Sequence, residues 1–251
     1  MTEKKKIKKL FYLSRKLLQK RHNIYIFGNN FLFLQSTHPF HLSKYKSVNS
    51  KKINLFFYLT YFFELIKNLI KIKLFFFKLI FTHNFSNIKK NYKNKTIIVR
   101  HLTSIKNFKN KIDTQYFGVE KAFEKNKSIS FFIDHIKTSP KEKKYLLSIK
   151  KNIFLNNNVT EISLYLKIIH NIFREIFYLI KKLKNINNNF EKRYYFECIK
   201  FLFSLSTIKN IILYYNLEYL IKKNKINKIL ITFEGHPYEY LIYLLSKIYK
   251  I

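Results

Sequence analysis

Apolar residues along the chain follow two patterns, short runs bounded by turn residues and longer stretches at helical spacing. The short runs, rich in β-branched and aromatic residues, predict strands at residues 24–27, 31–34, 96–100, 128–133 and 228–233. Helical spacing predicts helices at residues 7–18, 53–81, 116–125, 139–153, 159–186, 190–205, 207–223 and 238–249. Since strands alternate with helices, we expect a helix-rich α/β fold with a mostly parallel sheet and helices on both of its faces.

The most apolar segment, residues 53–81, predicts a basic amphipathic helix. One face carries Glu64, Lys67, Lys71 and Lys78, and the opposite face is apolar, with Leu65, Ile66, Leu69, Ile70, Phe76 and Phe77. The uncharged run covers only residues 53–63, whereas a membrane span needs roughly 20 mostly apolar residues. Two interpretations are open: a helix that packs on the core with a solvated lysine stripe, or a helix that lies on an anionic membrane.

A net charge of +35 at pH 7 gives the chain a strong attraction to anionic surfaces. Clustered Lys and Arg are typical of nucleic-acid-binding proteins, because they replace counterions on phosphate. Here lysine is spread along the whole length, and it is abundant together with Asn, Ile, Phe and Tyr, whose codons are rich in A and T. A genome rich in A and T accounts for this set without selection by a ligand. A basic RNA-binding or ribosome-associated protein is therefore the alternative function and not the leading one.

The remaining composition predicts a folded protein of a reducing compartment. Hydrophobic residues make up 47% of the chain, enough for a real core, and the one cysteine, Cys198, excludes a disulfide framework. Its position predicts a small buried helix residue. No segment resembles an export signal, so we expect a cytoplasmic protein, peripheral at the inner membrane face if residues 53–81 lie on lipid. The abundant aromatic residues fall at helical core spacing, and we expect them in the core and not as base-stacking platforms.

Polar residues follow three of the predicted strands. These are Arg100-His101, Asp134-His135 and Glu234-Gly235-His236. In open α/β sheets, ligands bind outside the carboxyl ends of the strands, so these positions predict a site. Gly235 permits a tight turn, and Pro237 suits the first position of a helix whose amino end favours an anion.

This arrangement predicts that Glu234 is a general base and that His236 contacts a phosphate. The alternative is structural: Glu234 caps the helix and His236 packs at the turn. No GxGxxG, GxxxxGK[ST], GxSxG or HExxH motif is present, which removes support from dinucleotide enzymes, P-loop NTPases, common hydrolases and zincins. His38 and His41 have no carboxylate or thiol nearby, so we expect a polar loop there, and no metal or bound cofactor.

The segment Ile229–Glu239, with its Phe233-Glu234-Gly235-His236 core followed by Tyr238 and Glu239, resembles a family of bacterial surface-carbohydrate biosynthesis proteins. Those proteins look like two-domain GT-B glycosyltransferases, and the position of Tyr238 is usually tryptophan in them. Two further segments are similar to the family: residues 97–100 leading to Asp113–Gly118, and the run 214–228 before the acidic strand. The resemblance covers residues 96 to 251.

The resemblance implies a glycosyltransferase-like protein of surface-polysaccharide biosynthesis. It implies one Rossmann-like α/β domain over residues 1–251, similar to the amino-terminal, acceptor-side half of a GT-B enzyme. The nucleotide-sugar-binding half would then come from a further carboxyl-terminal domain or from a partner chain. The expected substrates are a nucleotide sugar and a sugar acceptor, commonly lipid-linked. The expected site comprises Glu234 and His236 as catalytic residues, with Arg100, His135 and Gly235 binding the substrate.

Overall fold

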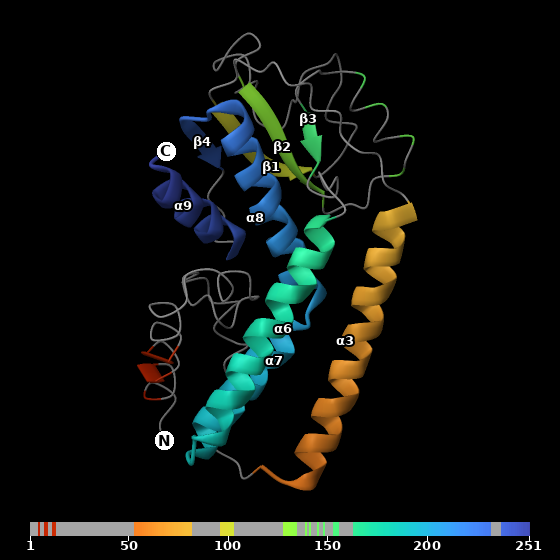
Figure 1. Ribbon diagram of the computed structural model, residues 1–251, viewed down its shortest axis with the longest axis vertical. Helices are drawn as coiled ribbons and strands as arrows, with labels where there is room; N and C mark the ends of the chain where they lie inside the picture. Colours follow the sequence, from red (N-terminus) through yellow and green to blue (C-terminus); the bar gives the residue numbers. More distant parts are fainter. Residues whose placement is uncertain are drawn as a thin grey trace. The chain divides into compact units, whose positions relative to one another are not determined.

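The computed structural model describes residues 5, 8–9, 12–13, 53–81, 96–102, 128–134, 139, 141, 145, 148, 153–155, 163–231 and 237–251. The chain divides into two compact units, one formed by Met1–Lys78, Ser163–Ile211 and Glu234–Ile242, the other by Leu79–Ile162, Ile212–Phe233 and Tyr243–Ile251. The predicted strands at 24–27 and 31–34, the predicted helix at 116–125 and the loop of His38 and His41 lie outside the described residues. Figure 1 labels the elements.

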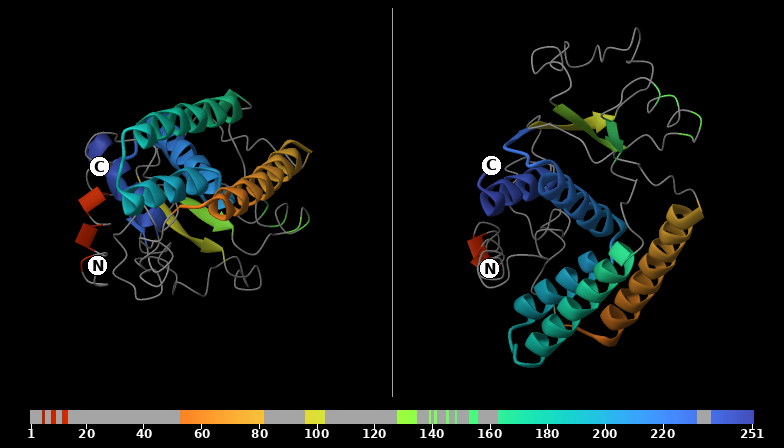
Figure 2. Two further views of the ribbon diagram at one scale, coloured as in Figure 1. Left: turned by 90° about the horizontal axis from the view of Figure 1, so that it is seen from below. Right: turned by 45° about the horizontal axis from the view of Figure 1, so that its top comes forward.

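The second unit contains a sheet of four strands in the order β3-β2-β1-β4. The strands are β1 (Thr96–Leu102), β2 (Ser128–Asp134), β3 (Ile153–Leu155) and β4 (Lys228–Ile231), and every pair is parallel. β1 pairs along its whole length with β2, from Thr96 opposite Ser128 to Leu102 opposite Asp134. On its other side β1 pairs with β4, from Thr96 opposite Lys228 to Val99 opposite Ile231. Figure 2 shows the strands from two further directions.

Both faces of the sheet are covered at its centre. Successive residues of a strand point to opposite faces, and Ile97, Ile98 and Val99 of β1 are all buried. The same holds in β2 for Ile129, Ser130 and Phe131. Strands buried on both faces read as continuous apolar runs, which is why the sequence predicts them well. The expectation of a helix-rich α/β fold with a parallel sheet is confirmed.

Strand β3 was not predicted. The sequence predicts a helix from Ser139 through Ile153, and Lys141, Tyr145 and Ser148 are indeed helical, but Ile153 begins β3. The prediction is wrong at its carboxyl end, because Ile153–Leu155 continues the helical spacing of apolar residues before it. The backbone of these residues instead pairs with Ser130–Phe132 of β2. A short apolar run cannot be assigned by periodicity alone, and here the pairing with β2 decides it.

The first unit is helical. It contains α3 (Leu55–Phe81, through Lys78), α6 (Ser163–Lys184), α7 (Asn189–Leu202) and the first part of α8 (Leu205–Asn224). Residues 185–188 join α6 to α7, so these two helices form a hairpin. The α6 core face is formed by residues at helical spacing, Leu164, Tyr165, Ile168, Ile172, Ile176 and Leu179. All four helices were predicted within a few residues of their ends. Among the described residues, no helix combines the length and apolarity that crossing a membrane requires.

Helix α8 contributes to both units, since the boundary between Ile211 and Ile212 falls inside it. It is buried on most of its circumference, including Ile211, Ile212, Leu213 and Leu217. Strand β4 follows it after a short connection. The last helix, α9 (Pro237–Tyr249), is also divided between the two units, after Ile242. The predicted first helical position of Pro237 is confirmed.

Asn188 caps α7, and its removal tests how much the helical hairpin depends on this end. Its side-chain oxygen accepts hydrogen bonds from the backbone N–H groups of Phe190 and Glu191, at 2.9 and 3.3 Å. We expect Asn188→Ala to lower the free energy of unfolding by about 1 kcal/mol. Urea denaturation followed by circular dichroism measures the change. The matched control is Asn187→Ala at an exposed neighbouring position; an equal loss in both variants would contradict the capping role.

Candidate functional site

The carboxyl edge of the sheet is the first candidate site. From β1 the chain adds β2 and then β3 on one side, whereas β4 lies on the other side of β1. The order of the strands therefore reverses at β1. In open parallel sheets, ligands bind outside the carboxyl ends of the strands at such a reversal. The described strands thus single out the ends of β1 and β4.

Of the expected catalytic and substrate-binding residues, Arg100 is the one that lies within the described strands; His101 and Asp134 from the same polar pairs also lie there, in β1 and at the end of β2. Arg100 lies in β1 opposite Phe132 of β2, two positions before Leu102, where the strand ends. His135, Glu234, Gly235 and His236 lie outside the described residues. In the sequence, His135 directly follows β2, and Glu234 comes three positions after Ile231, the last residue of β4. The predicted roles of these residues stay predictions.

The first turn of α9 contains the last two residues of the segment Ile229–Glu239. Tyr238 and Glu239 are both buried. Glu239 is also the acidic residue of the first turn, where a carboxylate interacts favourably with the helix dipole. Burial shows that both side chains have a packing role at the start of α9, so the resemblance at these two positions does not by itself indicate contact with a substrate.

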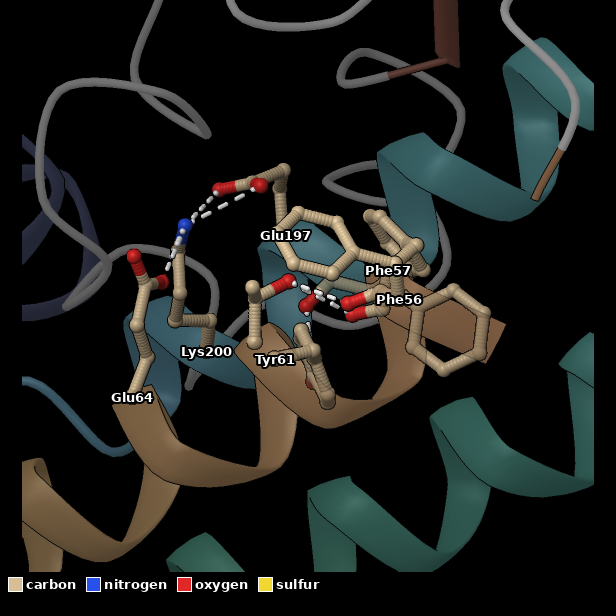
Figure 3. A network of polar contacts seen from close by, with 8 residues as sticks. Phe56, Phe57, Tyr61, Glu64, Glu197 and Lys200 are labelled. Atoms are coloured by element: carbon tan, nitrogen blue, oxygen red, sulfur yellow. Dashed lines mark hydrogen bonds and ion pairs between the residues drawn. The ribbon is translucent and has the colours of Figure 1, made fainter. Parts of the chain in front are cut away.

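A second cluster of polar side chains joins α3 to α7 (Figure 3). The ammonium group of Lys200 lies 3.0 Å from Oε2 of Glu64 and 2.8 Å from Oε2 of Glu197. The hydroxyl of Tyr61 donates a hydrogen bond to the backbone oxygen of Phe196 at 2.9 Å. Burial lowers the pKa of Lys200, but the carboxylates of Glu197 and Glu64 outweigh this effect, so that its pKa is raised. The cluster is an ion-pair network that fixes one helix on another.

Aromatic contacts surround this network. The ring of Phe196 packs edge-on against Phe57, Tyr58 and Tyr61, with centroid distances of 5.0 to 5.7 Å. The guanidinium of Arg193 lies 4.5 Å from the centroid of Phe57, a favourable cation–π distance. Burial, followed by the nearby carboxylates, raises the pKa of the Tyr61 hydroxyl. The amino-terminal half of α3 is therefore attached to α7 by half-buried aromatic and polar contacts. None of these contacts was evident from the sequence, because they join positions far apart in the chain.

The aromatic residues of α3 correct another prediction. They were expected in the core, yet Phe56, Phe62, Phe63 and Phe77 are between 58% and 72% exposed. The predicted apolar face of this helix is exposed as well at Ile66, Leu69 and Ile70. No described side chain of α3 is buried. The interpretation of residues 53–81 as an ordinary core-packing helix is therefore wrong for most of the helix surface.

Cys198 is confirmed as a buried residue of α7. Burial raises the pKa of its thiol well above the usual value, so the reactive thiolate is disfavoured. Within the described part of the chain, no group of three His, Cys, Asp or Glu side chains is arranged to hold a metal ion.

Comparison with known proteins adds no assignment: no family model, no curated protein and no solved structure matches this chain.

Replacement of Lys200 tests the network that attaches α3 to α7. Lys200→Met removes the cation that pairs with Glu197, whose side chain is only 14% exposed. We therefore expect the free energy of unfolding to fall by roughly 1 kcal/mol. Because the pKa of Lys200 is raised in the folded state, this contribution is complete below the unfolded lysine pKa of about 10.4 and fades as the pH rises through the folded value. Denaturant titrations at pH 7 and in strong alkali measure both effects.

The control is Lys184→Met, an exposed lysine in the last turn of α6. If the two variants are equally stable at pH 7, the network does not hold α3.

Proposed function

We propose that the chain is a glycosyltransferase-like protein of surface-polysaccharide biosynthesis, with a Rossmann-like sheet that binds a phosphate-bearing substrate at its carboxyl edge. One observation carries the proposal: the parallel strands reverse their order at β1, and Arg100 lies close to the carboxyl end of that strand. A guanidinium is well suited to phosphate, because it is always charged and donates paired hydrogen bonds. The segment Ile229–Glu239, which resembles the carbohydrate family, begins within β4, the strand on the other side of β1.

The proposal gives each predicted residue a role. Glu234 accepts a proton from the hydroxyl of the acceptor sugar. The hydroxyl oxygen attacks the anomeric carbon of the donor as the bond from that carbon to the phosphate oxygen breaks, and the nucleotide leaves with its phosphates. His236 and Arg100 contact phosphate. His135, which follows β2 in the sequence, also binds the substrate, and Gly235 allows a tight turn before α9. In the sequence, Pro237 directly follows His236 and begins α9, and the amino end of a helix favours an anion.

The substrates proposed are a nucleotide sugar and a lipid-linked acceptor, at the cytoplasmic face of the membrane. In this scheme a further domain or a partner chain binds most of the nucleotide sugar, and this chain supplies the acceptor side. RNA binding remains the alternative, supported by the net charge of +35 alone. The two functions differ in their salt dependence, since binding to RNA weakens steeply as salt displaces lysine from phosphate.

Arg100 provides the binding test. We expect Arg100→Gln to weaken binding of pyrophosphate and of geranyl diphosphate, a soluble lipid diphosphate, by roughly tenfold or more, because a charge-assisted hydrogen bond is lost. Isothermal titration calorimetry measures both ligands. The control, Arg174→Gln, removes the same charge from an exposed position on α6. Equal affinity in all three proteins, together with salt-sensitive binding of a single-stranded RNA, would favour the RNA-binding alternative.

Glu234 provides the catalytic test. In membranes that contain the lipid-linked acceptor and a labelled nucleotide sugar, we expect Glu234→Gln to reduce sugar transfer by roughly a hundredfold or more, because the general base is removed. Circular dichroism checks that the fold is retained, and Glu191→Gln in α7 is the control. Full activity of the Glu234 variant would remove this residue from the mechanism.

A further inference from the structure

Helix α3 has one side that contacts the rest of its unit. This side is formed by half-buried residues at helical spacing, Phe57, Tyr61, Leu65, Asn68, Ile72, Phe75 and Phe76. Phe57 and Tyr61 contact Phe196 of α7, and Phe76 packs edge-on against Tyr165 of α6 at 5.3 Å. Because α3 is attached along this one side, the rest of its circumference faces away from the helices that it contacts.

The side opposite these contacts is apolar and exposed. We call it the α3 apolar face, and it consists of nine residues that are 37% to 74% exposed, Leu55, Phe56, Leu59, Phe62, Phe63, Ile66, Leu69, Ile70 and Leu74. With 27 residues, α3 is about 40 Å long at the rise of an α-helix. Folded proteins seldom leave an apolar surface of this extent in water, so such a surface indicates a binding partner.

The charge beside the α3 apolar face identifies the kind of partner. Lys67 and Lys71 are exposed and follow Glu64 along one flank of the face. Glu64 is the one acidic residue of α3, and its carboxylate is paired with Lys200. The flank is therefore positive. Lys73 lies among the apolar residues, but the long stem of lysine can carry its ammonium group to the edge of an apolar layer.

A surface with an apolar centre and a positive flank is complementary to an anionic lipid bilayer. Helices of this kind lie in the plane of the interface, with apolar side chains below the headgroups and lysines at the phosphates. A second copy of the chain would bring two positive flanks together, each from a protein of net charge +35. RNA would leave the Phe, Leu and Ile side chains without apolar cover.

Helix α6 of the same unit repeats the combination. Its exposed apolar residues recur at helical spacing, Leu166, Ile169, Phe173, Phe177 and Ile180. Exposed basic residues follow on the adjacent side of this helix, Lys167, Arg174 and Lys181. Two helices of one unit thus combine exposed apolar and basic residues.

We propose that the first unit binds the surface of an anionic lipid bilayer through the α3 apolar face, with Lys67 and Lys71 at the lipid phosphates. The inference does not depend on sugar transfer, because lipid binding is a property of α3 and is measured without any substrate. It identifies the element that would hold the protein at the membrane and the lipid charge that it requires.

The test is co-sedimentation of the full chain with two kinds of vesicle. One kind contains phosphatidylcholine alone. The other contains phosphatidylcholine with roughly 30% phosphatidylglycerol, an anionic lipid that gives the vesicle a strong negative surface potential. We expect strong binding to the anionic vesicles and weak binding to the neutral ones. The triple variant Phe56→Ser, Phe63→Ser, Leu74→Ser should reduce partitioning to anionic vesicles by roughly tenfold or more, since three side chains lose their apolar contact with lipid. These positions are more than 60% exposed, so the fold should be retained.

Two matched controls separate the face from general effects. The variant Tyr12→Ser, Tyr145→Ser, Ile248→Ser removes three exposed hydrophobic residues elsewhere and should bind like the unaltered protein. Lys67→Glu with Lys71→Glu should weaken binding to anionic vesicles, whereas Lys225→Glu with Lys228→Glu makes the same change of net charge at exposed positions outside α3 and should have a smaller effect.

Three results would overturn the proposal. The first is undiminished binding of the folded α3 triple variant to anionic vesicles. The second is equal binding to neutral vesicles. The third is a dimer in solution that the α3 triple variant converts to a monomer, since a second copy would then cover the face. Absence of lipid binding in a protein that still binds pyrophosphate would contradict this inference alone. Lipid binding without pyrophosphate binding would contradict the proposed enzymatic function alone.

Discussion

Parallel pairing of the strands is the constraint on which the rest of the fold depends. Parallel neighbours cannot be joined by a tight turn, because the chain has to return to the opposite end of the sheet before the next strand begins. The longest such return, from β3 to β4, carries α6, α7 and α8. It also brings β4 to the free side of β1, where the strand order reverses. Helices α6, α7 and α8 and the position of β4 at the candidate edge therefore arise from the same connection.

The sequence predicts β1, β2 and the edge strand β4, but it misses β3 at the other edge of the sheet. Thr96–Leu102 and Ser128–Asp134 are recognisable because both faces are covered, which leaves continuous apolar runs. β3 is three residues long, and its assignment depends on a partner strand that local spacing does not reveal. At the candidate site, Arg100 lies close to the end of β1 as expected. The prediction for Glu234 rests on its place after β4 in the chain and on the resemblance of its motif.

Helix α3 shows why an apolar pattern does not identify the packed side of a helix when it covers more than half of the helix surface. The lysine flank is the same whether the helix packs on a core or lies on lipid, so spacing alone leaves both interpretations open. The packed side is chosen by Phe196 and Lys200 of α7, which the sequence gives no means of pairing with α3. The same limit applies to α6, where Ile172 is buried while the adjacent Phe173 is exposed, although both fit the helical period.

The hydrogen bond from Tyr61 to Phe196 joins residues 135 positions apart, and this separation has a consequence for biosynthesis. Translation proceeds from the amino terminus, so α3 leaves the ribosome long before α7 has been made. During that interval both apolar sides of α3 are uncovered, and the nascent chain presents about 40 Å of hydrophobic helix to its surroundings. The timing of synthesis thus gives chaperones and lipid surfaces access to this segment before the folded protein exists.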